Sequence, residues 1–274
     1  MVVQHNLTAM NSNRMLGITT NTQAKSTEKL SSGYKINRAA DDAAGLSISE
    51  KMRRQIRGLS QASTNAQDGV SLAQTAEGAL AEVQDMLQRI NELSVKSSNG
   101  TYTTTQRQYI ADEINQLTSE IDRVATTTKF NDMLLFSADA TFNLQIGAEK
   151  GEQLSLTTKA MTSTALGLSA TALAWSTDTT GSTSADYIPT IKTALERVAS
   201  ARSSLGAYQN RLEHTINNLD NIVENTQAAE SRVRDTDMAT EMVKYSNNNI
   251  LTQAGQAMLA QANQSNQGVL SLLQ

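Results

Sequence analysis

The sequence predicts a mainly α fold: a long antiparallel helical bundle, or coiled-coil rod, with one small β-hairpin and paired N- and C-terminal helices. Three observations lead to this prediction. Apolar residues recur at steps of three and four through long stretches, which is typical of amphipathic and coiled-coil helices. Proline occurs once, so long uninterrupted helices are permitted. Aromatic residues make up only 4% of the chain, which is thin for a compact globular core.

The first long helix is expected from Asp42 to about Ser98. Asp41 and Asp42 supply an N-cap and a favourable charge for the N-terminal end of the helix dipole, and Gly100 provides a C-terminal stop. The apolar stripe of this helix contains Met52, Ile56, Leu59, Ala66, Val70, Ala73, Leu80, Val83, Leu87 and Ile90.

Two further helices complete the expected bundle. The second begins after Thr103, which can form a capping box with Gln106. The third is expected from about Ile188 or Lys192 to Arg234. The stripe of the second helix contains Tyr109, Ile110, Ile114, Leu117, Ile121 and Val124. Long helices with narrow apolar stripes pack most simply as an antiparallel bundle.

The β signal lies at residues 141–158, which predict a hairpin with its turn at 147–151. Apolar residues alternate with polar ones on both sides of this turn: Phe142, Leu144 and Ile146 before it, Leu154 and Leu156 after it. Residues 163–186 are rich in Thr, Ser, Ala and Gly, and they are expected to form a short loop-like insertion.

Both ends of the chain are almost free of charge. Residues 1–13 contain no charged side chain apart from the ionisable His5, and residues 245–274 contain no Asp, Glu, Lys, Arg or His. Neither end can bury enough surface alone to offset the entropy of ordering, so we expect both to become helical against each other and against neighbouring copies of the chain. The residues expected to carry this self-assembly are Val3, Leu7, Met10, Leu251, Ala254, Met258, Ala262, Val269, Leu270 and Leu273.

Several function classes find no support in the sequence. The two histidines, His5 and His214, form no HExxH pair, and there is no GxGxxG or P-loop motif, so no enzyme, cofactor or metal site is expected. The absence of cysteine excludes disulfides and zinc-thiolate sites. A net charge of −4 argues against nucleic-acid binding. No stretch approaches the ~18 apolar residues of a membrane helix, and the N-terminus lacks the features of a cleavable secretory signal.

Two long segments resemble the terminal regions of bacterial flagellins. The first begins LSSGYKINRAADDAAGLSISEKMRRQIRGLSQAS at Leu30, and the second includes RSSLGAYQNRLEHTINNL and AMLAQANQSNQGVLSLL. The resemblance implies that residues 1–41 and 236–274 form the inner core of a filament. It also implies that 42–162 and 187–235 form an outer helical rod with the hairpin, and that 163–186 replaces the larger variable domains of longer flagellins.

The resemblance also implies a location and partners. The chain would be an extracellular part of the bacterial flagellum, exported by the flagellar type III route without a cleavable signal peptide. Its partners would be further copies of itself, an export chaperone at the C-terminal helix, and the filament cap and hook-junction proteins. A hook–filament junction protein of the same family remains the alternative. A signalling coiled coil would have charged heptads to its very end, and an enzyme carried on a flagellin scaffold would need a larger middle segment.

Flagellins are sensed by a vertebrate Toll-like receptor around a motif of the form LQRxxELxV, which is matched here by residues 87–95. The resemblance implies receptor contacts at Gln88, Arg89, Glu92 and Leu93, and at Glu113 on the adjoining helix. Arg89 and Leu93 are four residues apart and therefore share a helix face. Asn91 stands where many flagellins have a second Arg. On the other interpretation, Arg89 is a solvated surface charge and Leu93 an ordinary packing residue.

Overall fold

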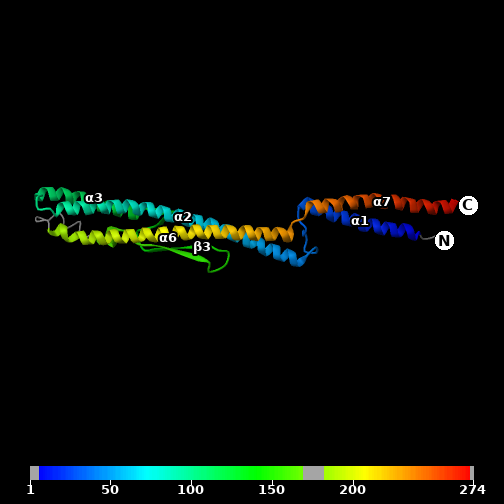
Figure 1. The fold of residues 1–274 in the computed structure, drawn as a ribbon, viewed down its shortest axis with the longest axis horizontal. Coiled ribbons are helices and arrows are strands. Elements are labelled where there is room, and N and C mark those ends of the chain that lie inside the picture. The colour runs from blue at the N-terminus through cyan, green and yellow to red at the C-terminus, as the bar shows by residue number, and fades with distance from the viewer. Residues whose placement is uncertain (1–5, 169–181, 272–274) are drawn as a thin grey trace. The chain divides into compact units, whose positions relative to one another are not determined.

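The computed structural model describes residues 6–168 and 182–271, including the side chains of 6–168 and 184–264 (Figure 1). The described elements are, in chain order, α1 (Leu7–Ser32), α2 (Ala43–Ser97), α3 (Thr104–Thr127), β1 (Lys129–Phe130), β2 (Met133–Leu134), β3 (Ala140–Gln145), β4 (Gln153–Thr158), α4 (Ser163–Leu166), α6 (Ser182–Arg234) and α7 (Met238–Ser271). The fold is mainly α, as the apolar periodicity predicts.

The chain divides into two compact units. Residues 57–223 form the first, which we call the bundle unit. The residues before 57 and after 223 form the second, which we call the terminal unit.

In the bundle unit, α2 and α6 run antiparallel and α3 packs beside them (Figure 1). Contacts at well-separated levels show this direction. The hydroxyls of Ser97 and Ser184 lie 3.0 Å apart, and the hydroxyl of Ser63 lies 3.1 Å from a carboxylate oxygen of Asp220. Between these two levels, Arg202 on α6 bonds Glu77 and Gln84 on α2. The predicted antiparallel bundle is therefore confirmed.

The core of the bundle unit contains most of the predicted stripes. Its buried members from α2 and α3 include Ala73, Leu80, Val83, Leu87, Ile90, Ile110, Ile114 and Ile121. The prediction was wrong for Tyr109, whose side chain is 68% exposed. One residue step rotates a side chain about 100° around a helix, so Tyr109 is carried off the core face that its neighbour Ile110 occupies.

The capping box at the start of α3 is confirmed: the Gln106 backbone N–H donates to the Thr103 hydroxyl, and the Thr103 N–H donates to the Gln106 side chain. At the start of α2 only one of the two aspartates caps the helix. Asp42 accepts from the backbone N–H of Gly45 at 2.9 Å, whereas Asp41 accepts from the N–H groups of Asn37 and Arg38 in the preceding loop.

The α2–α3 turn is held by a buried arginine. Helix α2 ends at Ser97, three residues before Gly100, which was expected to stop it. The Arg107 side chain is 4% exposed and donates to the carbonyl oxygens of Ser97 and Asn99, each at 3.1 Å. A cation at the last carbonyls of a helix satisfies unpaired acceptors and complements the helix dipole.

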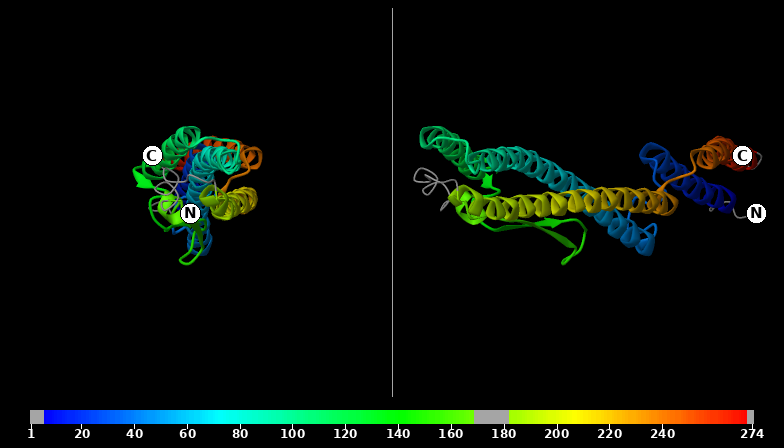
Figure 2. Two further views of the ribbon diagram at one scale, coloured as in Figure 1. Left: turned by 90° about the vertical axis from the view of Figure 1, so that its left-hand side faces the viewer. Right: turned by 60° about the vertical axis from the view of Figure 1, so that its left-hand side comes forward.

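The predicted hairpin is present as β3 and β4, which pair antiparallel with Phe142 opposite Leu156 and Leu144 opposite Leu154. It lies along α6 (Figure 2), and Ala66, Leu154 and Leu212 form a shared buried cluster. A second pair, β1 with β2, was not predicted. Each of its strands has only two residues, too few for alternation to be visible, and its turn at Asn131 and Asp132 has φ of 46° and 63°.

The prediction of a loop-like insertion at 163–186 was wrong at both ends, because both ends are helical. Residues 163–166 form α4, which is capped by Thr162 accepting from the backbone N–H of Ala165. The backbone N–H and hydroxyl of Ser163 donate to Asp122. Helix α6 begins at Ser182, earlier than the expected start at about Ile188 or Lys192, and it includes Pro189. The contact of Ser184 with Ser97 anchors the extra turns. Residues 169–181 lie outside the described residues.

In the terminal unit, α1 and α7 pair, as predicted, and they run antiparallel (Figure 1). The Asn6 side chain donates to the carbonyl of Ala262, and Thr252 donates to Gln23. The segments that follow α1 and precede α7 are joined by backbone hydrogen bonds, including one from Thr236 N–H to the carbonyl of Gly33 at 2.9 Å. Within the described part of the chain, no helix is long and apolar enough to cross a bilayer.

Candidate assembly and recognition surfaces

The contact between α1 and α7 uses mainly small and polar side chains. Ser26 and Glu241 are its most buried members, and Thr252 bonds Gln23 at 3.1 Å. Gly255 faces Leu16, which is one of the few large apolar side chains turned toward the partner helix. The two helices are therefore held together by close packing of small side chains and by hydrogen bonds. Most of their large apolar side chains do not take part in this contact.

The large apolar side chains of both helices lie on the outer faces of the pair. Their exposed fractions run from 46% to 66%. We call this set the terminal apolar surface; it comprises Leu7, Met10, Met15, Ile18, Met238, Met242, Val243, Ile250, Leu251 and Met258. Single exposed apolar residues are ordinary, but a large set on one helix pair indicates a surface that binds a partner.

The predicted self-assembly residues divide into three groups. Leu7, Met10, Leu251, Ala254 and Met258 are exposed. Ala262 is half-buried, and its backbone carbonyl accepts a hydrogen bond from Asn6 at the α1–α7 contact. Val3 and Leu273 lie outside the described residues, and so do the side chains of Val269 and Leu270. Apolar spacing pointed to the exposed members, but it missed Met15, Ile18 and the start of α7.

Glu241 is a buried carboxylate at the α1–α7 contact, with 6% of its surface exposed. A hydrogen bond from Ser26 on α1 lowers the pKa of this carboxyl below its ordinary value, and Lys244 and Lys29 lower it further. Lys244 lies 3.4 Å away on the same helix. The α1–α7 contact thus stabilises the ionised form of Glu241.

This arrangement predicts a pH dependence of the terminal unit. Because the pKa of Glu241 is lower in the folded chain, its contribution is fully present above its unfolded pKa and is lost as pH falls through the folded value. We expect the protection of α1 amides from hydrogen exchange, measured relative to their intrinsic exchange rates, to fall below about pH 4.5. The part of this loss that is attributable to Glu241 is expected to vanish in Glu241→Gln. An unchanged loss in that variant would assign the acid response to other carboxylates.

The predicted receptor-binding residues include an ion-pair cluster on α2 and α3. The Arg89 guanidinium donates to one oxygen of Glu113 at 2.9 and 3.0 Å and to Glu92 at 3.2 Å. Hydrogen bonding to Glu113, and then to Glu92, raises the pKa of Arg89 above its ordinary value. All three side chains are about half exposed or more, so the cluster contributes little to stability but orients a cation and a carboxylate on the surface.

The remaining predicted receptor residues differ in exposure. Gln88 is exposed beside Arg89. Leu93 is 2% exposed and belongs to the core of the bundle unit, so it can support the cluster but presents almost no surface. Two exposed apolar residues on the same helices were not predicted: Val95, 53% exposed, and Tyr109. Apolar spacing alone does not distinguish the exposed Val95 and Tyr109 from the buried Leu93. The exposed fractions of the side chains in the structure do.

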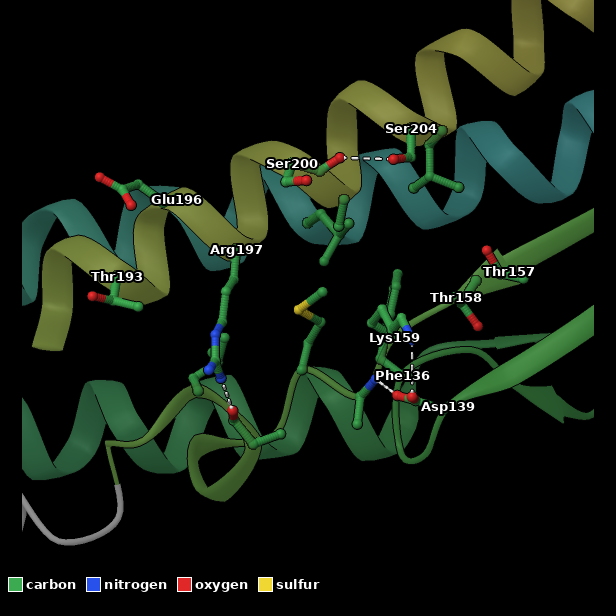
Figure 3. A pocket seen from close by; sticks show the side chains of 17 residues that line it. Phe136, Asp139, Thr157, Thr158, Lys159, Thr193, Glu196, Arg197, Ser200 and Ser204 are labelled. Carbon is green, nitrogen blue, oxygen red and sulfur yellow. Dashed lines mark hydrogen bonds and ion pairs between the residues drawn. The ribbon is translucent and has the colours of Figure 1, made fainter.

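The bundle unit also has a cavity of about 620 Å³, bordered by α6 and by the segment that follows β4 (Figure 3). Its rim cations already have partners: Lys159 bonds Asp139 at 3.2 Å, and Arg197 donates to the carbonyl of Ala165 at 2.6 Å. The described residues contain no group of three or more His, Cys, Asp or Glu that could hold a metal ion.

Comparison with known proteins decides the family. Residues 3–141 match the bacterial flagellin N-terminal helical region, and residues 188–273 match the bacterial flagellin C-terminal helical region. The chain belongs to the bacterial flagellin family. It is 55% identical over 274 residues to a flagellin of Halalkalibacterium halodurans, and 49% identical over 286 residues to a flagellar filament core protein of Treponema maltophilum. Both alignments cover all of each chain.

Among solved structures, the chain is similar to a putative flagellar hook-associated protein from Vibrio parahaemolyticus. The TM-score is 0.61 and the identity 13%, over 71% of this chain and all of the other. At that identity the likeness concerns the fold alone. Flagellins are structural proteins.

Proposed function

We propose that this chain is the structural subunit of a bacterial flagellar filament, and that it polymerises for swimming motility. The observation that carries the proposal is the terminal apolar surface, on a chain 55% identical over its whole length to a flagellin. Residues 1–41 and 236–274 form the inner filament core, residues 42–162 and 187–235 form the outer bundle with its hairpin, and the short variable segment lies between α4 and α6.

Export and assembly partners follow from the same proposal. The chain leaves the cell by the flagellar type III route without a cleavable signal peptide. A chaperone covers the C-terminal helix before export, and the filament cap and hook-junction proteins meet the chain at the growing and basal ends. The uncharged, outward-facing apolar side chains of α7 support the need for a chaperone, because an exposed apolar set of this size favours aggregation in the cytoplasm.

The alternative within the family is a hook–filament junction protein. Expression in a bacterium that lacks its own flagellin separates the two. A filament subunit restores long filaments and swimming, whereas a junction protein restores neither but rescues a strain that lacks the junction. The full-length identity to flagellins and to a filament core protein favours the first outcome.

We further propose that the Arg89 cluster binds the flagellin-sensing Toll-like receptor of a vertebrate host. The support is geometric: Arg89, Glu92 and Glu113 present their charges on adjoining helices, with Gln88 exposed beside them. An Arg side chain with fixed partners loses little conformational entropy on binding, and Arg is enriched among the residues that dominate interfaces.

Replacing Arg89 with Ala is expected to weaken binding of the receptor ectodomain by at least about tenfold, with unchanged helical content. Surface plasmon resonance with the full chain measures this. The matched control is Arg123→Ala, which removes another exposed arginine paired to a glutamate within α3. Equal affinity of wild type and Arg89→Ala would remove Arg89 from the binding surface, and equal losses in both variants would indicate a nonspecific charge effect.

A further inference from the structure

Methionine is concentrated on the terminal apolar surface. Of the ten methionines in the sequence, five lie on this surface: Met10, Met15, Met238, Met242 and Met258, with exposed fractions of 46% to 63%. The bundle unit provides two natural references, since Met161 is 3% exposed in its core and Met133 is 43% exposed on its surface.

An exposed thioether reacts with peroxides. A sulfur lone pair attacks one oxygen of hydrogen peroxide, so that an S–O bond forms, the O–O bond breaks and water leaves. Sulfur is oxidised to the sulfoxide while the peroxide is reduced. The reaction turns a flexible apolar side chain into a polar one. The five surface sulfurs are therefore accessible targets on the described parts of α1 and α7, and Met161 is shielded by its burial.

We propose that these five methionines form a modification site for peroxide oxidants, and that their oxidation in the unassembled chain prevents polymerisation. This inference rests on the proposed function, because it requires the terminal apolar surface to lose solvent in the filament. The other members of that surface are Leu, Ile and Val, which offer no side-chain donor to a sulfoxide oxygen. Burying such an acceptor without a hydrogen bond disfavours association.

The α1–α7 contact survives the modification. Its inner face is held by side chains such as Asn6, Gln23 and Thr252, and none of the five methionines is buried there. The oxidised chain thus keeps its paired helices and loses only the outward contact. Oxidation is therefore expected to depend on assembly. Once neighbouring subunits cover the terminal apolar surface, its sulfurs are protected from peroxide. Met133 does not belong to this surface, so covering the surface does not by itself protect Met133.

The test uses the full chain and hydrogen peroxide. Purified subunits are treated, quenched and placed under salting-out conditions, and the pelleted fraction and electron micrographs report filaments. Peptide mass mapping reports which methionines carry oxygen. We expect untreated chain to polymerise, and treated chain to need at least about a tenfold higher concentration. Circular dichroism is expected to be unchanged. Treating preformed filaments is expected to leave the five methionines largely unmodified.

Two variants and one enzyme treatment complete the design. The chain with all five methionines changed to Leu is expected to polymerise with or without peroxide, whereas Met133→Leu is expected to remain sensitive. Incubation of the oxidised wild type with methionine sulfoxide reductases A and B is expected to restore filaments, and this readout does not depend on how the fivefold variant folds.

The outcomes separate the inference from the function beneath it. If untreated subunits polymerise and oxidised subunits polymerise equally well, the inference is overturned and the proposed function stands. Failure of the reductases to restore filaments would also overturn it, as would loss of assembly by the peroxide-treated Leu variant. If untreated subunits form no filaments at all, the proposed function falls and the inference falls with it.

Discussion

Placing a charge at Met258 is expected to abolish filament formation at subunit concentrations where the wild type polymerises. Met258 is 62% exposed on α7, within a segment that contains no charged residue. In Met258→Glu the carboxylate loses its water when neighbouring subunits cover the surface, and no cation from residues 245–274 can compensate it. An uncompensated buried charge costs about 3 kcal/mol or more, which corresponds to roughly a hundredfold in the concentration needed for assembly.

Sedimentation after salting out, with electron microscopy of the pellet, measures the effect. Met258→Leu is the matched control and is expected to assemble as the wild type does, because it keeps an apolar side chain of similar volume. Circular dichroism of the Glu variant is expected to show a folded chain, since Met258 lies outside the α1–α7 contact. Normal filaments from Met258→Glu would show that this part of α7 is not an intersubunit surface.

Removing the side chain of Arg107 is expected to destabilise the bundle unit by about 2 to 4 kcal/mol. The guanidinium is buried and bonds the carbonyls of Ser97 and Asn99, so Arg107→Ala leaves these acceptors short of donors and opens a void at the α2–α3 turn. Chemical denaturation of the full chain, followed by hydrogen exchange at the turn, measures the loss. The expected signature is faster exchange at the last residues of α2.

Arg123→Ala provides the comparison on the same helix. Arg123 is exposed and pairs with Glu120 three residues away, an arrangement that contributes little to stability. Its replacement is expected to leave the unfolding midpoint close to that of the wild type. If the two arginine variants unfold alike, Arg107 is a dispensable surface charge, contrary to the role assigned to it at the end of α2.

Long periodic elements were the easiest part of the fold to predict. The stripe of α2 and the capping box at Thr103 are local patterns, and the structure has both almost where the sequence places them. The hairpin followed from alternation alone. The β1–β2 pair was not predicted because each of its strands has only two residues, too few for an alternating pattern to show. The early start of α6 was not predicted because it depends on Ser184 meeting Ser97, a contact between residues far apart in sequence.

The surfaces were harder to predict than the core. A sequence stripe shows which residues share a helix face, but it does not show whether that face points toward the partner helix or away from it. Ala262 and Met258 both belonged to the predicted assembly set, yet Ala262 is half-buried, with its carbonyl bonded to Asn6, and Met258 is 62% exposed. Leu93 was predicted from a motif and is buried. The role of Glu241 needs Ser26, which lies more than two hundred positions away in the chain.

The central claim is that the chain polymerises through its uncharged paired ends. Electron microscopy under salting-out conditions tests it most directly, with the full chain compared to a version trimmed to residues 41–236 that keeps α2, α3 and α6 whole. We expect long filaments from the full chain. We expect none from the trimmed chain, which circular dichroism should show to be helical. Filaments from both versions, or dispersed particles from both, would contradict the claim.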